Sequence, residues 1–187
     1  MPRAPTFDVE AARQRALEVF WLRGYANASM RDLLEAMDLG EGSFYNTFSS
    51  KHALFLTTID LYSEAVEQQL SAELAQGGSP RAALRRLLHK VLNLTAGRGC
   101  FFGNCAGEVA VHDEQAALRV RAGLTRLQRI FQRALRDSDE LAAETAIKDN
   151  AEFLVAHVQG LAVLGKAGVP ARRLSALAEQ ALDAIGI

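Results

Sequence analysis

Apolar residues recur every three or four positions along most of this chain, the spacing that places them on one face of a helix. Ala, Leu, Glu, Gln and Arg, which favour helices, are abundant, whereas alternating runs of Val, Ile and Thr do not occur. The pattern therefore predicts an all-α protein of nine helices. These helices are predicted over residues 8–23, 30–37, 41–48, 51–75, 80–95, 104–111, 114–136, 144–166 and 171–185.

Short polar or glycine-containing breaks separate the predicted helices. Asp8 and Ser29 can cap helices, and Asp32 follows Ser29 at the spacing of a capping box. Gly24 can end the first helix in a left-handed turn. The second and third predicted helices are short, and a tight turn over residues 38–40 joins them. Two short helices joined in this way form a candidate helix-turn-helix unit.

A helix-turn-helix unit places its second helix in the major groove of DNA, where residues near the helix N-terminus meet base edges. In the helix over 41–48, Phe44 and Phe48 lie four positions apart and can pack inward. The residues beside them carry hydroxyl and amide groups suited to phosphate oxygens and base edges. They are Ser43 and Thr47, the candidates for base edges, together with Tyr45 and Asn46. Gly42 leaves room for close approach to the duplex, and Lys51 lies in the first turn of the next helix, where backbone N–H groups also attract phosphate.

The first 60 residues carry six basic and eight acidic side chains, so this segment has no excess of positive charge. Counterion release drives sequence-independent DNA binding, and its contribution should be weak here. We expect binding to depend on a few well-placed groups instead. Arg31 and Lys51 are the expected cationic contacts to phosphate, with Tyr45 and Asn46 as neutral donors. A surface ion pair is the alternative role of Arg31.

These residues give the segment over 29–54 a resemblance to the DNA-binding domain of the TetR/AcrR family of bacterial transcription regulators. The residues that carry it are Ser29, Arg31, Asp32, Leu33, Gly42, Ser43, Phe44, Tyr45, Phe48, Ser50 and Lys51, preceded by "ALEVFWLRGY" over 16–25. Two positions depart from the family pattern. Asp38 stands where a Gly is usual, and Glu41 stands where a basic residue is common.

The resemblance implies a helix-turn-helix DNA-binding domain over residues 1–50 and a helical ligand-binding and dimerisation domain over 51–187. It also implies a transcription regulator whose partners are a double-stranded DNA operator, a small-molecule effector and a second copy of the chain. The candidates for DNA contact are Ser29, Arg31, Gly42, Ser43, Tyr45, Asn46, Thr47 and Lys51.

The stretch "GRGCFFGNCAGEVAVHD", residues 97–113, is the most informative part of the second domain. Phe101 and Phe102 are adjacent and cannot both face the same core on one helix, so we expect one of them to line a cavity. An apolar cavity with a few polar groups is the usual form of a small-molecule site. Ordinary core packing is the alternative for every residue proposed here. The candidates for effector contact are Tyr62, Thr95, Cys100, Phe101, Phe102, Asn104, Phe153 and His157.

The only two cysteines, Cys100 and Cys105, lie five positions apart. On a helix their Cα atoms would be about 8 Å apart, beyond the roughly 7 Å that a disulfide spans. A metal site would need further ligands, and His112 alone does not supply them. Buried and inert thiols are therefore expected. The alternative is a redox or electrophile sensor that uses Cys100, since some members of the resembled family with a Gly-Cys at this point respond to electrophiles.

The helices predicted over 144–166 and 171–185 carry apolar stripes that suit a four-helix interface between two copies of the chain. One short recognition helix reads few base pairs, so specificity normally requires two half-sites about 34–36 Å apart. Packing within a single chain is the alternative. The candidates for the dimer interface are Leu154, Val158, Leu161, Leu174, Leu177 and Leu182.

Other classes of function have little support in the sequence. It has no nucleophile–base pair, metal-ligand spacing or Gly-rich phosphate loop, so we expect neither an enzyme nor a bound metal or cofactor. No apolar run approaches the roughly 20 residues of a membrane span, and the N-terminus lacks a signal-peptide core, so no membrane partner and a cytoplasmic location are expected. The hypothesis is a ligand-responsive repressor that binds a palindromic operator as a homodimer and is released by a small molecule. A helical protein-interaction module without DNA binding is the alternative.

Overall fold

The computed structural model describes residues 7–136 and 143–187, and in these two ranges all regular secondary structure is helical, as predicted. Nine helices are found there. They are α1 (Val9–Asn27), α2 (Met30–Met37), α3 (Glu41–Phe48), α4 (Lys51–Leu74), α5 (Pro80–Thr95), α6 (Phe101–Glu108), α7 (Glu114–Leu135), α8 (Glu144–Lys166) and α9 (Ala171–Ala184).

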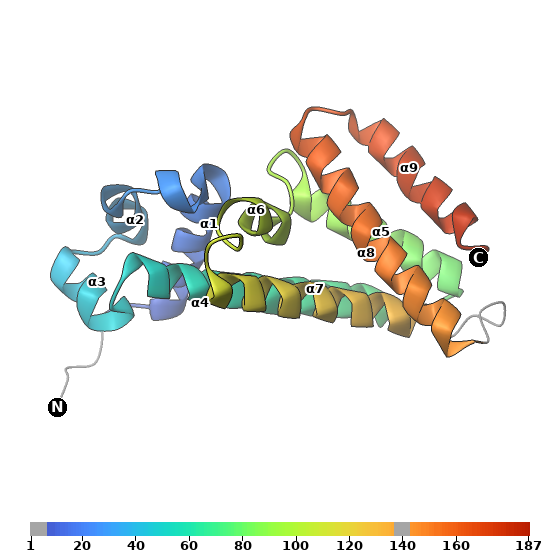
Figure 1. Cartoon of the computed structure of the whole chain (residues 1–187), viewed down its shortest axis with the longest axis horizontal. Helices are drawn as coiled ribbons and strands as arrows, with labels where there is room; N and C mark the ends of the chain where they lie inside the picture. Colours follow the sequence, from blue (N-terminus) through green and yellow to red (C-terminus); the bar gives the residue numbers. More distant parts are fainter. Residues whose placement is uncertain (1–6, 137–142) are drawn as a thin grey trace.

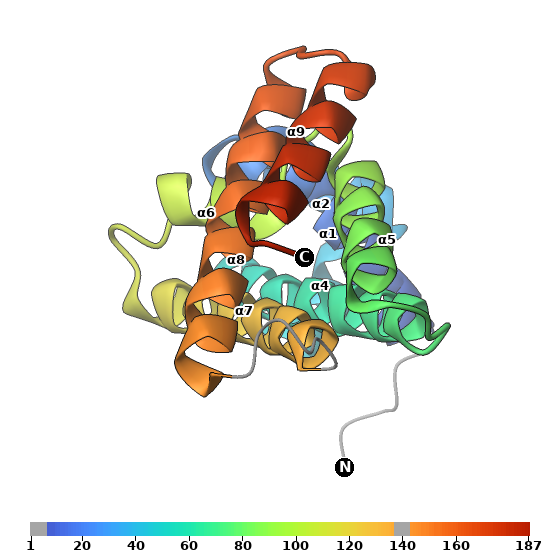
Figure 2. The same cartoon turned by 90° about the vertical axis from the view of Figure 1, so that its right-hand side faces the viewer.

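The helices form two groups that two long helices connect. In Figure 1, α1, α2 and α3 gather at one end around the start of α4, and α5, α8 and α9 form the other end. α4 and α7 run side by side along the long axis and pack on each other, and Figure 2 shows α8 and α9 leaning together above α7. α6 lies between the two groups and packs on both α1 and α7. The buried apolar side chains form one continuous cluster through both groups.

Helix caps explain the boundaries of the N-terminal group. The Asp8 side chain accepts hydrogen bonds from the N–H groups of Glu10 and Ala11 at the start of α1. Ser29 and Asp32 form the predicted capping box, which fixes the start of α2. Phe44 and Phe48 of α3 are buried, as predicted. α3 therefore packs on the N-terminal part of the apolar cluster with one face only.

The first helix differs from its prediction. Gly24 has φ 78° and ψ 170°, so it leaves the helical conformation where the sequence predicted the helix to end. The chain then resumes a last helical turn that ends at Asn27. The observed α1 is therefore a helix with a break near its end, and this last turn leads directly into the cap of α2.

The sixth helix corrects two predictions. It was predicted over 104–111 and lies instead at Phe101–Glu108, because Gly97 and Gly99, with φ of 73° and 75°, end the preceding loop earlier than the sequence suggested. The expectation that two adjacent phenylalanines cannot both face the core is also wrong. Phe101 and Phe102 are each only 1% exposed. Both are buried because α6 is enclosed on two sides, so that Phe101 packs toward Trp21 while Phe102 packs toward α7.

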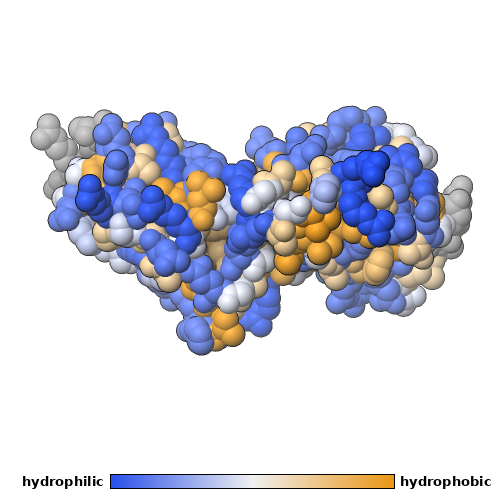
Figure 3. Space-filling view, turned by 90° about the horizontal axis from the view of Figure 1, so that it is seen from above, coloured by the Kyte–Doolittle hydropathy of each residue, from blue (hydrophilic) through white to orange (hydrophobic). Residues whose placement is uncertain are grey.

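The molecular surface seen from above is mostly hydrophilic, and the most extended hydrophobic area in this view lies on the C-terminal group near the middle of the molecule (Figure 3). α8 contributes three of the large apolar side chains that remain exposed, which are Phe153, Val163 and Leu164. No helix of the described ranges combines the length and the apolar character needed to span a lipid bilayer.

Candidate nucleic-acid interface

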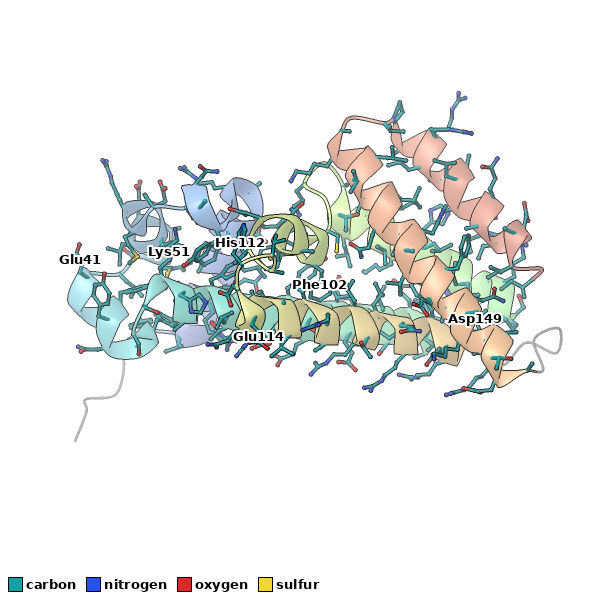
Figure 4. The ribbon with its side chains drawn as sticks, in the orientation of Figure 1. Glu41, Lys51, Phe102, His112, Glu114 and Asp149 are labelled. Atoms are coloured by element: carbon teal, nitrogen blue, oxygen red, sulfur yellow. The ribbon has the colours of Figure 1, made fainter. Side chains whose placement is uncertain are left out.

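The predicted recognition helix α3 has one buried and one exposed face. Phe44 is fully buried and Phe48 is 7% exposed, whereas Tyr45 is 51% exposed. Four other residues on the outer face are exposed as well, namely Glu41, Gly42, Ser43 and Asn46. Thr47 is half-buried. The alternation arises because the two phenylalanines are one helical turn apart and anchor the helix on the α1–α4 core. The polar side chains between them are consequently held toward solvent, at the end of the molecule that Figure 4 marks with Glu41.

Backbone geometry leaves the start of α3 open to a ligand. Gly40 caps the helix without any side-chain hydrogen bond, and a Cβ atom added at Gly40 or Gly42 would meet no atom within 4 Å. Free N–H groups at a helix N-terminus favour a phosphate. The carboxylate of Glu41 in the first turn opposes that preference. The hydroxyl of Thr47 donates to the carbonyl of Ser43 at 2.9 Å, so it is bound to its own helix in this structure.

Arg31 lies at the edge of a shallow surface hollow between α2 and α3. The hollow has a volume of about 570 Å³ and is also lined by Leu34, Asp38 and Glu41. The carboxylate nearest in sequence to Arg31, that of Asp32, pairs with Arg23 at 3.0 Å. Hydrogen bonds from Ser29 lower the pKa of the Asp32 carboxyl, with the neighbouring arginines adding to the effect. Within the described ranges Arg31 makes no ion pair closer than 4 Å, so its guanidinium remains available.

Lys51 lies deeper than the other candidates. It begins α4 directly after the cap residue Ser50, and its ammonium lies 4.5 Å from the centre of the Tyr25 ring. Burial lowers the pKa of Lys51, and the negative charge of Glu108 at the end of α6 partly opposes this effect. Figure 4 shows Lys51 between α3 and α6. Lys51, a candidate phosphate contact, is therefore influenced by Glu108, which lies outside the N-terminal group.

Four of the predicted effector residues meet in one buried aromatic cluster around α6. The Tyr62 ring lies 5.5 Å from Phe101 and 4.8 Å from Phe102, measured between ring centres. The hydroxyl of Tyr62 is 3.7 Å from the sulfur of Cys100. Burial, together with the Cys100 thiol, raises the pKa of Tyr62 well above its ordinary value. These side chains fill the space between α1, α4 and α7 and leave it closely packed.

The remaining four effector candidates lie elsewhere. Thr95 is buried and donates its hydroxyl to the carbonyl of Val91. Asn104 accepts a hydrogen bond from Lys166 of α8 at 3.0 Å. Phe153 is 43% exposed on the outer face of α8, stacked on His157, whose ring is 3.1 Å from the Leu177 carbonyl. The predicted set is therefore not one site.

A groove that the sequence did not indicate lies between the end of α5 and the α8–α9 connection. Its volume is about 210 Å³, and its lining includes His89, Asn93, Gly97, Leu174 and Ser175. These five residues come from α5, from the loop after it and from α9, so only the tertiary packing brings them together. No periodicity in the sequence could have revealed this groove.

Most of the predicted interface leucines and valines pack inside the chain. Leu154, Val158, Leu161 and Leu182 are at most 2% exposed, and Leu174 is 8% exposed. Leu177 is half-buried. The exposed apolar side chains of α8 belong to a neighbouring stripe of the same helix, at Phe153, Ala156, Gly160, Val163 and Leu164.

Both cysteines are free and buried. Burial strongly raises the pKa of the Cys105 thiol, with the nearby Cys100 and Glu108 adding to the shift. A high thiol pKa keeps the unreactive protonated form at neutral pH. Across the two described ranges, no group of three or more His, Cys, Asp or Glu side chains is arranged to hold a metal ion.

A protein-family model, sequence relatives and solved structures all agree with the helix-turn-helix described above. The family model described as bacterial regulatory proteins, tetR family, matches residues 13–58. The uncharacterized HTH-type transcriptional regulator YezE of Bacillus subtilis (strain 168) is 30% identical over 162 residues, which is 82% of this chain and 84% of YezE. The HTH-type transcriptional repressor ComR of Escherichia coli (strain K12) is 25% identical over 184 residues, covering 94% of this chain and 88% of ComR.

The solved structures agree with these relatives. A cysteine mutant of the TetR family transcriptional regulator CifR, complexed with 26-bp double-strand operator DNA, superposes with a TM-score of 0.81 at 32% identity over 98% of both chains. The relatives are regulators of transcription and not enzymes, and the all-α architecture with an N-terminal helix-turn-helix is theirs as well. The chain is a DNA-binding regulator of transcription and belongs to the TetR family of bacterial regulatory proteins.

Proposed function

We propose that this chain is a ligand-responsive repressor that binds a palindromic operator as a homodimer and is released by a small molecule. The observation that carries the proposal is the division of α3, in which Phe44 and Phe48 are buried while Tyr45 and its polar neighbours face solvent. A helix anchored in this way presents a rigid polar edge to a DNA groove. ComR is a repressor, and CifR is a regulator found with operator DNA, which supports the same assignment here.

The proposal gives each candidate at the DNA interface a role. Arg31, Tyr45, Asn46 and Lys51 bind phosphate, and Ser29 adds a hydroxyl at the start of α2. Ser43 and Thr47 meet base edges beside Gly42, whose missing side chain allows close approach. Thr47 must first exchange its hydrogen bond to the Ser43 carbonyl for one to the base. In this proposal residues 1–50 form the DNA-binding domain and residues 51–187 hold the effector and the partner copy.

The proposed dimer uses the exposed faces of α8 and α9. The stripe through Phe153, Gly160 and Val163 is apolar and exposed, and the small residues in it allow two helices to approach closely. Leu177 on α9 is half-buried and extends this surface. A dimer presents two α3 helices, which is the arrangement that a palindromic site requires. Because its target is operator DNA, the proposed location is the bacterial cytoplasm.

The proposed effector acts on the cluster of Tyr62, Cys100, Phe101 and Phe102. This cluster is closely packed, so an effector that enters it has to displace α6 or α4. Such a ligand changes DNA binding only to the extent that its affinity differs between the two states of the protein. A small, largely apolar molecule fits this requirement, since it replaces buried aromatic contacts with its own.

Selection of bound fragments from genomic DNA tests the DNA-binding part. We expect the purified protein to enrich a palindrome with two half-sites separated by about one helical turn. The Lys51→Ala variant should bind this fragment more weakly than the wild type. The dependence of its DNA affinity on salt concentration should fall by about one phosphate contact. Lys148→Ala, on the exposed side of α8, is the matched control. Failure to enrich any sequence, or equal affinity of both variants with the wild type, would contradict the proposal.

A thiol-sensing form of the same regulator has one specific observation in its favour. The sulfur of Cys100, at the cap of α6, contacts the Tyr62 hydroxyl, so a group added to this sulfur would have to displace the helix. If the protein senses thiol-reactive compounds through Cys100, treatment of the native protein with iodoacetamide should abolish operator binding in the wild type. Operator binding of Cys100→Ser should be unaffected. Unmodified Cys100 after prolonged treatment, or full binding after modification, rules it out.

A further inference from the structure

The break in α1 leaves two backbone N–H groups that a distant carboxylate binds. After Gly24 leaves the helical conformation, the N–H groups of Tyr25 and Ala26 begin a new helical turn, and the first N–H groups of such a turn have no partner within it. Glu108, the last residue of α6, accepts both hydrogen bonds, from Tyr25 at 3.0 Å and from Ala26 at 2.7 Å. Glu108 therefore caps a helical turn of the N-terminal group from 82 positions further along the chain.

The close approach depends on Gly24 for two reasons. Its φ of 78° is unfavourable for a residue with a side chain. A Cβ atom at this position would also lie 2.6 Å from Oε2 of Glu108, closer than two such atoms can be. The absence of a side chain at Gly24 thus permits both the break and the contact with the carboxylate.

The capped turn leads directly into the helix-turn-helix. Ala28, which is fully buried, follows this turn and donates to the Gly24 carbonyl, and Ser29 then caps α2. No flexible residue separates the Glu108 contact from the start of α2. The orientation of α2 and α3 relative to α4 is consequently set in part by where Glu108 lies.

Glu108 also acts on the phosphate candidate of α4. The Tyr25 ring, on the capped turn, lies beneath the ammonium of Lys51, and the negative charge of Glu108 favours the charged form of Lys51. One carboxylate therefore influences both the entry to the helix-turn-helix and the cation at the start of α4.

Apart from Glu108, α6 and the loop before it contact helices of both groups. The loop before α6 holds α1 through the Trp21 indole, which donates to the Gly99 carbonyl at 2.9 Å. Inside α6, Asn104 accepts a hydrogen bond from Lys166 at the end of α8. Phe102 is packed against Gly123 of α7, as its place between α6 and α7 in Figure 4 indicates. A shift of α8 or α7 that carries α6 with it changes the position of Glu108.

We propose that Glu108 is the positioning residue that holds the helix-turn-helix in its DNA-binding orientation, and that an effector releases the operator by withdrawing this carboxylate from the Gly24 break. The inference rests on the proposed function and adds the contact through which the effector works. Without the cap, the turn over residues 25–27 has unpaired N–H groups, and α2 and α3 sample several orientations. DNA binding then has to restore the order, which lowers the affinity.

The test uses the protein over residues 1–187, in the proposed dimer, and the DNA fragment that the wild type selects. We expect Glu108→Gln, which keeps the size of the side chain and loses its charge, to bind this fragment at least about tenfold more weakly than the wild type. Glu108→Asp retains the charge with a shorter reach and should recover part of the affinity. Glu64→Gln is the matched control, because Glu64 is exposed on α4 and the substitution is the same. This variant should bind the fragment like the wild type.

A second measurement separates positioning from stability. Hydrogen exchange of the Tyr25 and Ala26 amides should be faster in Glu108→Gln while amides in the middle of α7 are unchanged. Wild-type affinity in Glu108→Gln, or loss of affinity with uniformly faster exchange throughout the protein, overturns the inference and leaves the proposed function intact. A wild type that selects no DNA fragment overturns the proposed function itself and the inference with it.

Discussion

Asp38 holds a conformation that few side chains tolerate. It ends α2 with φ 56° and ψ 50°, in the left-handed region, at the position where the resembled family usually has a glycine. An aspartate in this region is strained relative to glycine. We predict that Asp38→Gly raises the free energy of unfolding by about 0.5–1 kcal/mol, as measured by urea denaturation. Asp38→Ala should be less stable than the wild type, and an equal or lower stability of Asp38→Gly would contradict the argument.

Cys105 should make the stability of the protein depend on alkaline pH. Burial raises the pKa of its thiol in the folded state, whereas the thiol of the unfolded chain titrates near pH 8.5, an approximate value. Above that pH the unfolded state loses a proton that the folded state keeps, so the free energy of unfolding falls by up to about 1.4 kcal/mol per pH unit. Below it, the contribution of this thiol is fully present.

The comparison with Cys105→Ala isolates this effect. The free energy of unfolding is measured by urea denaturation under reducing conditions. Between pH 8 and pH 10 it should fall by about 1–2 kcal/mol more in the wild type than in the variant. Other groups, including Tyr62, titrate in both proteins and cancel in the difference. Parallel curves for the two proteins would show that the Cys105 thiol ionises equally well in the folded state.

At the scale of elements, the sequence predicted helices best where a side chain caps them or where their apolar stripe is long. The bounds of α2 and α5 were predicted correctly, and both begin behind a serine that accepts a hydrogen bond from the third residue of the helix. α8 has no side-chain cap, but its 23 residues carry many repeats of the apolar spacing. α3 and α6 both have eight residues and no side-chain cap. The bounds of α3 were nevertheless predicted correctly, between the turn over residues 38–40 and Ser49, whereas those of α6 were misplaced by three residues.

The candidate sites were predictable to the extent that one helix alone determines them. The outward face of α3 follows from the spacing of Phe44 and Phe48, and the structure has the two phenylalanines buried. The effector candidates depended on which helices meet, so Tyr62 and Phe101 came together whereas Phe153 did not. On α8, apolar residues occupy two neighbouring stripes, and the sequence does not tell which one faces the chain's own core.

The contact between α6 and α7 allows no additional atom. A Cβ at Gly123 would lie 2.3 Å from the ring of Phe102, which is itself enclosed by Tyr62. We predict that Gly123→Ala lowers the free energy of unfolding by about 1–3 kcal/mol, because the ring has to move within a close-packed core. Thermal denaturation checks this value.

Gly107 provides the matched control for this contact. It also lies in a helix, and a Cβ added there would meet no atom within 4 Å. Gly107→Ala should therefore stabilise the protein by up to about 1 kcal/mol through the higher helix propensity of alanine. If both alanine variants are equally stable, the packing of Phe102 against α7 does not limit the core.

At the scale of the whole molecule, the exposed apolar stripe of α8 is the feature that a single chain leaves unexplained. Val163 is 65% exposed, although a valine loses favourable free energy when it stays in water. If two copies bury this stripe against each other, a charge introduced there has to be buried without a partner. In an isolated chain the same charge would remain in solvent and cost little.

We therefore predict that Val163→Glu raises the dissociation constant of the proposed dimer by at least about 100-fold, a change of some 2.7 kcal/mol or more. Leu118→Glu is the matched control, because Leu118 is 54% exposed on α7, away from this stripe. Analytical ultracentrifugation should show a monomer for Val163→Glu and a dimer for Leu118→Glu. The monomeric variant can reach only one half-site at a time, so its operator affinity should fall as well, while its α3 remains unchanged. A dimeric Val163→Glu protein with full operator affinity would mean that the two recognition helices are brought together by another face of the molecule.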